Sequence, residues 1–271
     1  MFNENKKSEL PCVMTIAGSD SGAGAGIQAD LLTFASHGVF GTTAISALTA
    51  QNPENVSAVS APDANVLLAQ MEAIASYFKP KSAKTGMLFN AEIIEIVADF
   101  FKRNPQIKLV LDPVMISTSG AKLLKDDAID ALKTKLIPLA EVITPNLDEG
   151  TVLLDVEKIT DVNSSALAMA KKYGVNVLLK GGHLDGDDIF DVLATPQGES
   201  NILQSKRIPN INTHGSGCTL SASIASNLAK GFGLFESCKY AQEYIVAAMK
   251  NPLETAGDRF INHFPKKWVR H

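Results

Sequence analysis

The segment best suited to chemistry is the hexapeptide Thr213-His214-Gly215-Ser216-Gly217-Cys218. Its two glycines allow backbone conformations and close approaches to a ligand that other residues do not. The small-residue run that follows, with Leu220, Ile224 and Leu228 on one face, predicts a helix. A glycine turn that opens a helix can bind an anion, because unpaired N–H groups and the positive end of the helix dipole point to the same place.

Cys218 falls in the first turn of this predicted helix. A helix N-terminus lowers the pKa of a thiol and favours the thiolate. The sequence therefore predicts a base or nucleophile beside a bound anion. The alternative is an ordinary helix start with a buried cysteine.

A second glycine-rich loop, residues 18–26, follows the apolar run Val13–Ala17 and precedes a helical pattern that starts at Ile27. Two known phosphate loops share this order of strand, loop and helix. The P-loop closes with Lys-Ser or Lys-Thr, which is absent here. The dinucleotide fingerprint needs G-x-G-x-x-G and an acidic residue about 20 positions later. This loop reads G-x-G-x-G, and no acidic residue lies between Asp30 and Glu54.

Asp30 falls at the edge of the apolar stripe of the first predicted helix, beside Ile27 and Phe34. A carboxylate at such a place needs a partner. Either it accepts hydrogen bonds from a bound substrate, or it caps or ion-pairs with a neighbouring loop.

Polar residues follow four of the predicted strands. These motifs are Lys84-Thr85-Gly86-Met87, Asp112-Pro113-Val114-Met115, Thr144-Pro145-Asn146-Leu147-Asp148-Glu149 and Lys180-Gly181-Gly182-His183. Asp112 and Glu149 supply carboxylates suited to Mg²⁺, and Lys180 supplies a cation for phosphates. Together with the predicted anion-binding loop, residues 213–218 (the anion loop), these groups indicate phosphoryl transfer from a nucleotide.

The elements that position these groups alternate between strand and helix. Strands are predicted at 13–17, 42–50, 82–86, 107–111, 141–144 and 175–179, and helices at 63–78, 126–136, 163–173 and from the cap Asn90 to 103. Continuous apolar strands alternating with helices predict an α/β fold with a mainly parallel sheet covered on both faces. Residues 189–206, around Pro196-Gln197-Gly198, predict a hairpin at or near a sheet edge. One domain, 1–271 with a polar extension 1–10, is expected.

Composition sets mild bounds on the 271 residues. With 45% hydrophobic residues, a net charge of −4 and no basic cluster larger than Lys266-Lys267, nucleic acid is not an expected partner. No apolar run resembles a signal peptide or spans a membrane, so we expect a soluble, cytoplasmic protein. The widely spaced Cys12, Cys218 and Cys238 fit neither a disulfide framework nor a zinc site. Cys12 and Cys238 are expected to be packing residues.

The chain resembles the hydroxymethylpyrimidine/phosphomethylpyrimidine kinases of thiamine biosynthesis, in the ribokinase-like superfamily. The resemblance covers nearly the whole chain in order. It rests on A-G-S-D-S-G-A-G-A-G-I-Q-A-D (17–30), T-A-Q-N (49–52), K-T-G-M-L (84–88), D-P-V-M (112–115), T-P-N-L-D-E (144–149), K-G-G-H (180–183) and T-H-G-S-G-C-T (213–219).

This resemblance implies a ribokinase-like domain, usually a homodimer, that uses ATP and Mg²⁺. It implies a pyrimidine pocket formed by Gly18, Ala25, Asp30, Gln51, Met87 and Val114. It implies a nucleotide site near Asp112, Asn146, Glu149, Lys180 and Thr213, with Asp112 and Glu149 close to the metal, directly or through water. Cys218 would be the catalytic base, and backbone N–H groups of Gly215, Ser216 and Gly217 would hold the charge that builds on the transferred phosphoryl group. The Gln51 amide, with one acceptor and two donors, matches the edge of an aminopyrimidine.

Two departures from the family pattern stand out. The loop after D-P-V-M, residues 116–122, begins Ile116-Ser117-Thr118-Ser119-Gly120 where the family often has a lysine, and Pro53 replaces the usual threonine after A-Q-N.

Three alternative functions stay open. A pyridoxal kinase of the same branch would be expected to keep a cysteine in that loop, and none occurs between Pro113 and Leu123. A sugar kinase would carry an aspartate base in the last loop, and a non-catalytic binding protein would not need this many polar groups.

Overall fold

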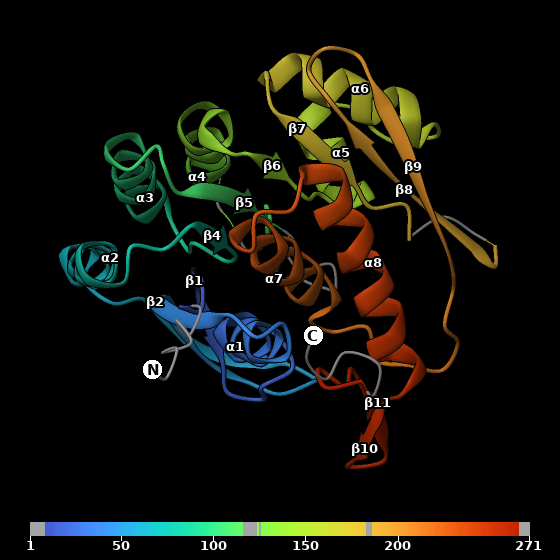
Figure 1. The fold of residues 1–271 in the computed structure, drawn as a ribbon, viewed down its shortest axis with the longest axis horizontal. Helices are drawn as coiled ribbons and strands as arrows, with labels where there is room; N and C mark the ends of the chain where they lie inside the picture. The colour runs from blue at the N-terminus through green and yellow to red at the C-terminus, as the bar shows by residue number, and fades with distance from the viewer. Residues whose placement is uncertain (1–8, 116–123, 125, 183–185, 266–271) are drawn as a thin grey trace, which may run out of the picture.

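The computed structural model describes residues 9–115, 124, 126–182 and 186–265, and within them nine strands form one twisted sheet (Figure 1). The strands are β1 (Cys12–Asp20), β2 (Phe40–Gln51), β3 (Val56–Ser60), β4 (Ser82–Thr85), β5 (Lys108–Leu111), β6 (Val142–Ile143), β7 (Asn176–Leu179), β8 (Asp188–Ala194) and β9 (Ser200–Lys206). Their order is β3-β2-β1-β4-β5-β6-β7-β8-β9. The six strands from β2 to β7 are parallel, and β3, β8 and β9 are antiparallel to their neighbours.

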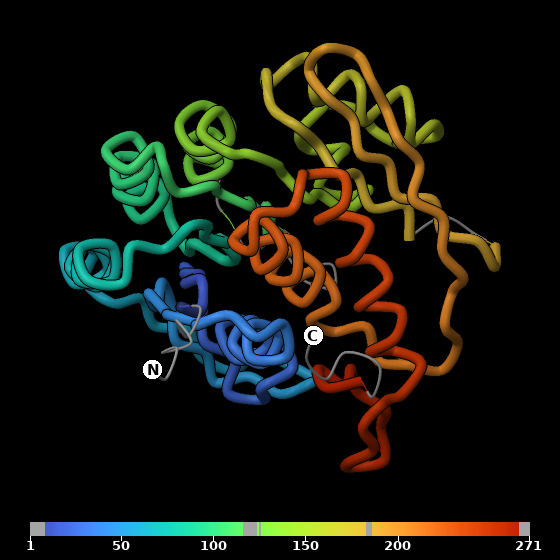
Figure 2. Tube along the Cα trace, viewed as in Figure 1, coloured from blue at the N-terminus to red at the C-terminus, as the bar shows by residue number. Residues whose placement is uncertain are grey.

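Helices cover both faces of the sheet. One face carries α1 (Gly26–Ser36), α7 (Ser216–Ala229) and α8 (Leu234–Lys250), which lie together in the trace of Figure 2. The other carries α2 (Ala64–Phe78), α3 (Ala91–Arg103), α4 (Asp126–Ala131), α5 (Leu147–Leu154) and α6 (Val162–Tyr173). A π-helical turn, η1 (Leu132–Leu136), and a 3₁₀ turn, η2 (Ile137–Leu139), follow α4. A small antiparallel hairpin joins β10 (Leu253–Thr255) and β11 (Asp258–Phe260).

Alternation along the strands explains the two cores. In β5, Leu109 and Leu111 pack against the α2–α6 layer, whereas Val110 between them packs against α7 and α8. Successive side chains of a strand point to opposite faces, so a strand buried on both sides must be apolar throughout. The predicted α/β fold with a covered, mainly parallel sheet is confirmed.

The predicted elements are present, with boundaries shifted by a few residues. Asn90 caps α3 as predicted, its side chain accepting from the Ile93 N–H at 2.9 Å. The hairpin β8–β9 forms the predicted sheet edge. Cys12 and Cys238 are buried, as expected of packing residues.

Several elements were not predicted from the sequence, among them β3, α5, β10 and β11. The side chains of β3 are all exposed, so no alternating pattern marks it. Helix α5 has only eight residues and begins within a motif interpreted as a strand end. The strands β10 and β11 have three residues each. Short or solvent-facing elements carry little hydrophobic periodicity.

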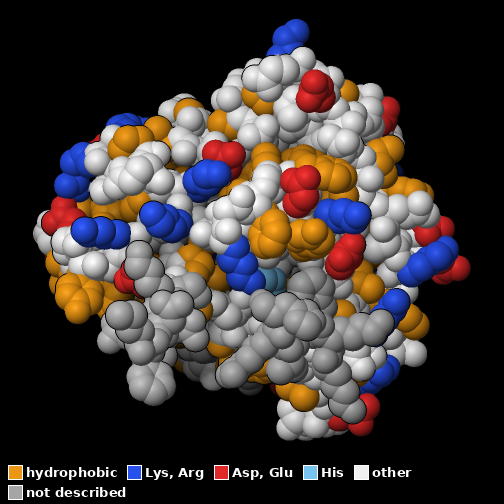
Figure 3. Space-filling view, viewed as in Figure 1, with side chains coloured by type: hydrophobic (Ala, Val, Ile, Leu, Met, Phe, Trp, Pro, Cys, Tyr) orange, Lys and Arg blue, Asp and Glu red, His pale blue; other side chains and the backbone are white. Residues whose placement is uncertain are grey.

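Within the residues described, no helix is both long enough and apolar enough to cross a bilayer. Acidic and basic side chains are interspersed on the face shown in Figure 3.

Candidate active site

The carboxyl ends of the parallel strands meet the N-terminus of α7, and this junction gathers most of the sequence-predicted site residues. Gly215 caps α7 with a φ of +80°, the left-handed region that favours glycine. A Cβ at Gly215 would collide with the carbonyl oxygen of Gly24. The anion loop before α7 therefore packs directly on the glycine loop after β1.

Cys218 lies in the first turn of α7 and is only partly exposed. Burial raises the pKa of its thiol, and the nearby Lys84 ammonium and the Gly26 N–H offset only part of this rise. The prediction that the helix start lowers this pKa is therefore wrong, because desolvation outweighs the dipole. Within this site, the thiol rests in its neutral form at pH 7.

Asp30 and Lys84 form a completely buried ion pair. Lys84 Nζ lies 2.9 and 3.0 Å from the two Asp30 oxygens, and the Thr15 hydroxyl donates to Asp30 Oδ2 at 2.6 Å. Burial tends to raise the pKa of Asp30, and Lys84 and Thr15 oppose it. The sequence left open whether Asp30 binds a substrate or forms an ion pair with a neighbouring loop. The contacts are those of an ion pair, although the partner, Lys84, lies in a strand rather than in a loop. Asp30 thus supports the site from beneath it.

Asp112, Lys180 and Glu149 form the charged part of the site. Lys180 Nζ lies 3.2 Å from Asp112 Oδ1, which also accepts from the Thr144 hydroxyl at 3.1 Å. Burial raises the pKa of Glu149 to about 7, with Lys180 opposing the shift and Asp112 adding to it. A Cβ at Gly217 would lie 3.2 Å from Lys180 Nζ and 3.3 Å from Asp112 Oδ2. The bare glycine backbone leaves this space beside the charges.

The two carboxylates suit a divalent cation. Both are nearly fully buried, and both lie beside Lys180. Mg²⁺ keeps most of its waters and needs one or two protein oxygens, so this donor set fits it. Glu149 also belongs to the capping box of α5. It donates its N–H to Asn146 Oδ1 at 2.8 Å, and its Oε2 accepts from the Asn146 N–H at 2.9 Å. The local helix start therefore holds Glu149 in place.

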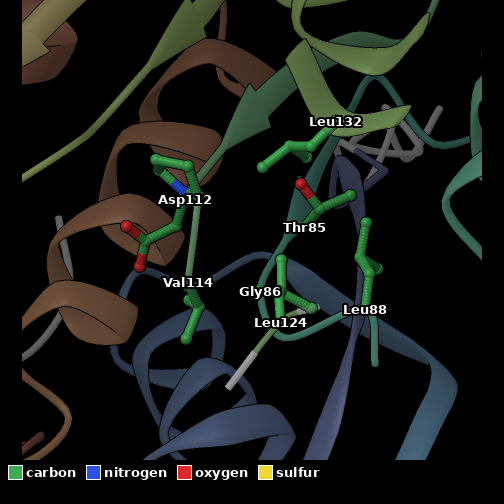
Figure 4. Close-up of a pocket in the computed structure, with 8 residues that line it drawn as sticks. Thr85, Gly86, Leu88, Asp112, Val114, Leu124 and Leu132 are labelled. Carbon is green, nitrogen blue, oxygen red and sulfur yellow. The ribbon is translucent and has the colours of Figure 1, made fainter. Parts of the chain in front are cut away.

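Three residues predicted for the pyrimidine pocket lie at or just after the carboxyl ends of strands: Gly18 in β1, Met87 after β4 and Val114 after β5. A Cβ at Gly18 would lie 3.7 Å from Met87 Sδ, so these two residues are neighbours. Val114 lines a small gap at the ends of β4 and β5 (Figure 4). In the same view the Asp112 carboxylate points toward α7, away from Thr85 and Leu132.

Three groups of this junction lie in motifs that the sequence singled out but were given no role of their own: Asp20, His214 and the buried Lys84. Asp20 accepts from the N–H groups of Gly22 at 2.8 Å and Ala25 at 2.9 Å, and it lies 3.0 Å from His214 Nε2. Gln51 Nε2 lies 3.2 Å from the same His214 nitrogen. The signal for Lys84 was its position in an otherwise buried strand. The partners of Asp20 and His214 are 194 positions apart, and no local pattern links them.

The remaining predicted residues take less central places. Thr213 is exposed, and its carbonyl accepts from the Ser216 N–H at 3.0 Å, which closes the turn before α7. His183, residues 116–122 of the loop after D-P-V-M, residues 1–8 of the N-terminal extension and Lys266-Lys267 lie outside the described residues.

The family of the chain follows from its similarity to known sequences. A model of the family described as phosphomethylpyrimidine kinase matches residues 20–261. The chain belongs to this family. A hydroxymethylpyrimidine/phosphomethylpyrimidine kinase of Haemophilus influenzae is 47% identical over 251 residues, which are 91% of this chain and 93% of that protein.

Solved structures of similar kinases have the same fold as this chain. A Bacillus subtilis pyridoxal kinase in an ADP complex matches with a TM-score of 0.87 and 36% identity, over 96% of this chain and 99% of that one. A phosphomethylpyrimidine kinase of Clostridium difficile 630 matches with a TM-score of 0.77 and 38% identity, over 89% of this chain and all of that one. The fold is ribokinase-like, as the sequence predicted.

Proposed function

We propose that this chain is the kinase that phosphorylates 4-amino-5-hydroxymethyl-2-methylpyrimidine, and then its monophosphate, with ATP in thiamine biosynthesis. The observation that carries the proposal is the placement of Cys218. It lies at the start of α7, between the glycine loop after β1 and the Asp112–Lys180 pair, in a chain that belongs to the phosphomethylpyrimidine kinase family. An acceptor hydroxyl on one side and a phosphate on the other would meet at this thiol.

Each of these groups would have its own part in the phosphoryl transfer. Cys218 first loses its own proton to solvent, and the resulting thiolate takes the proton of the hydroxymethyl group while the hydroxymethyl oxygen forms a bond to the γ-phosphorus and the bond to ADP breaks. The raised pKa of the thiol makes its conjugate thiolate a strong base. Backbone N–H groups of Gly215 and Gly217 hold the charge on the transferred group, whereas the Ser216 N–H, which donates to the Thr213 carbonyl, shapes the loop that presents them. Lys180 binds a phosphate oxygen.

A bound Mg²⁺ would neutralise phosphate charge during the transfer. Asp112 and Glu149 are the residues that would hold it, directly or through water. Asn146 and Thr213 complete the proposed nucleotide side. Glu149 binds a proton more readily than an ordinary carboxyl, since burial raises its pKa to about 7, so the metal would bind best when this proton has left.

On the acceptor side, Gly18, Ala25, Gln51, Met87 and Val114 would surround the pyrimidine ring. Gln51 is partly exposed at the end of β2, so its amide can reach a ligand. Asp30 would act on this pocket indirectly, through Lys84 and Thr15.

We further propose a single-domain chain that works in the cytoplasm as a homodimer. The support for the dimer is the presence of exposed apolar side chains at one edge of the sheet, Leu48 on β2 and Val56 and Val59 on β3. A second copy packing there would remove them from water.

Pyridoxal is the second candidate substrate, because a pyridoxal kinase matches the fold with a TM-score of 0.87. It also carries a hydroxymethyl group on an aromatic ring. The absence of cysteine between Pro113 and Leu123 favours the pyrimidine.

The test is to incubate the purified protein with ATP-Mg²⁺ and either hydroxymethylpyrimidine or pyridoxal, and to identify products by mass. We expect a much higher kcat/KM for hydroxymethylpyrimidine, followed by conversion of its monophosphate to the diphosphate. An equal or higher kcat/KM for pyridoxal would establish the second candidate instead.

A further inference from the structure

The Asp20 carboxylate is the point at which two loops from opposite ends of the chain meet. Oδ1 accepts from the Gly22 N–H at 2.8 Å, and Oδ2 accepts from Gly24 and Ala25 at 3.1 and 2.9 Å. Its oxygens therefore shape the glycine loop after β1 from inside. Burial alone would raise the pKa of Asp20, but hydrogen bonds from His214, Gly22 and Ala25 outweigh it and hold the pKa below its ordinary value. The group is a carboxylate at neutral pH.

His214 brings the anion loop to this carboxylate. The ring nitrogen Nε2 of His214 lies 3.0 Å from Asp20 Oδ2, and the backbone N–H of His214 donates to Asn212 Oδ1 at 3.0 Å. Because Asp20 is ionised and can only accept, Nε2 must carry the hydrogen of this bond. The imidazole thus bridges the two glycine loops.

The backbones of the loops are in contact as well. A Cβ at Gly24 would lie 2.6 Å from His214 Cδ2, and a Cβ at Gly215 would collide with the Gly24 carbonyl oxygen. The glycines therefore permit an approach that the Asp20–His214 bond then fixes. One loop carries Ala25 of the proposed pyrimidine pocket, and the other carries the proposed phosphate N–H groups and leads into Cys218.

We propose that Asp20 and His214 are positioning residues that clasp the acceptor loop (residues 20–26) to the anion loop (residues 213–218), so that the two halves of the site are ordered together. The inference rests on the proposed kinase function. Its consequence is that loss of the clasp loosens both loops, although each residue lies in only one of them. Holding two reactants in the right geometry accounts for a large part of the rate enhancement, so small displacements of either loop lower the rate strongly.

Hydrogen exchange tests the clasp without any substrate. In the unliganded protein, His214→Gln should accelerate amide exchange at least fivefold in both peptides, 20–26 and 213–218, while exchange in the core strands β4 and β5 stays unchanged. Asp188→Asn is the matched control, because it removes the carboxylate of an exposed pair with Lys206 on the β8–β9 hairpin. It should change neither peptide. Acceleration confined to 213–218, or to neither loop, would overturn the proposal.

A double-mutant cycle tests the same point in catalysis. His214→Gln should lower kcat/KM for the pyrimidine about tenfold in the wild-type background and less than twofold in an Asp20→Asn background. An equal loss in both backgrounds would show that His214 acts independently of Asp20, and the clasp would be wrong. A wild-type protein that phosphorylates no pyrimidine would instead refute the proposed function, and the exchange experiment would still judge the clasp. A folded-state check by near-UV circular dichroism accompanies each variant.

Discussion

At the scale of single residues, the reactivity of Cys218 is set by its surroundings rather than by its place at a helix start. Burial raises its thiol pKa, and Lys84 compensates only in part. If the thiolate is the base, kcat should rise with pH above 7, because the ionised fraction grows as pH approaches the raised pKa.

Replacing the thiol should therefore remove the base and leave binding intact. Cys218→Ala should lower kcat roughly 10²–10⁴-fold, flatten the rise with pH and change ATP affinity little. Steady-state kinetics from pH 6 to 9.5 measure all three. Cys238→Ala, which removes a buried thiol in α8, should keep the wild-type kcat. A Cys218→Ala variant within threefold of wild type would mean that the anion loop catalyses the reaction without a thiol base.

Gln51 is the second residue with a separable effect. Its Oε1 accepts from the Thr49 hydroxyl at 3.1 Å, and this bond holds the amide at the end of β2. Gln51→Leu keeps the volume and removes the hydrogen bonds, which should cost about 1–3 kcal/mol, or roughly 5- to 150-fold in pyrimidine affinity.

Because the ring must be anchored in both steps, Gln51→Leu should weaken the first and the second phosphorylation together. Separate assays of the two half-reactions provide the measurement. Gln204→Leu on the exposed strand β9 is the control and should impair neither. If Gln51→Leu also impairs neither, the pyrimidine pocket lies elsewhere and the amide is structural.

At the scale of elements, the start of α7 depends on Gly215. Alanine there would adopt a φ of +80° and would also drive its Cβ into the Gly24 carbonyl. Gly174, at the end of α6, has a similar φ of +69° with nothing within 4 Å of a Cβ. Both substitutions should destabilise the fold by about 1–2 kcal/mol through the backbone conformation.

Only Gly215→Ala should also displace the two glycine loops and lower kcat/KM, by an expected tenfold or more. Urea unfolding and steady-state kinetics on both variants separate the two effects. Equal kcat/KM in Gly215→Ala and Gly174→Ala would show that the contact between the loops is unimportant for catalysis.

At the scale of the whole molecule, two buried histidines link stability to pH. Burial lowers the pKa of His37 and of His263 to about 4. His37 contacts Ser223 of α7 at 2.8 Å, and His263 contacts Thr219 at 3.1 Å, so both brace the helix that carries Cys218. In the unfolded chain these rings protonate near pH 6.5.

The folded state therefore gains from their neutral form above pH 6.5 and loses that gain as pH falls toward 4. The loss should approach about 3 kcal/mol for each ring below pH 4. Glu149 acts in the opposite direction over this range, because its pKa of about 7 lets the folded state bind a proton before the unfolded chain does. Urea unfolding of the wild type and of His263→Gln at pH 7.5, 6 and 5 therefore isolates one ring, and the free energy of unfolding should fall less with decreasing pH in the variant. An equal pH dependence in the two proteins would mean that the His263 ring is protonated in the folded state as readily as in the unfolded chain.

The sequence by itself determined the order of strands and helices, the parallel sheet and the glycine loops, because each depends on local periodicity and on residues adjacent in the chain. It also placed Asp112, Glu149, Lys180 and Cys218 at strand or helix ends. In a parallel sheet those ends meet along one edge, so their proximity followed from the fold class.

Only the tertiary structure decided what surrounds each group. It paired Asp30 with Lys84, 54 positions away, and Asp20 with His214, 194 positions away. It also reversed the predicted shift of the Cys218 pKa, because the dipole of a helix start is a local property of the chain whereas desolvation depends on everything packed around the sulfur. Protonation state, burial and contacts across the sheet are properties of the assembled layers, so no window of sequence contains them.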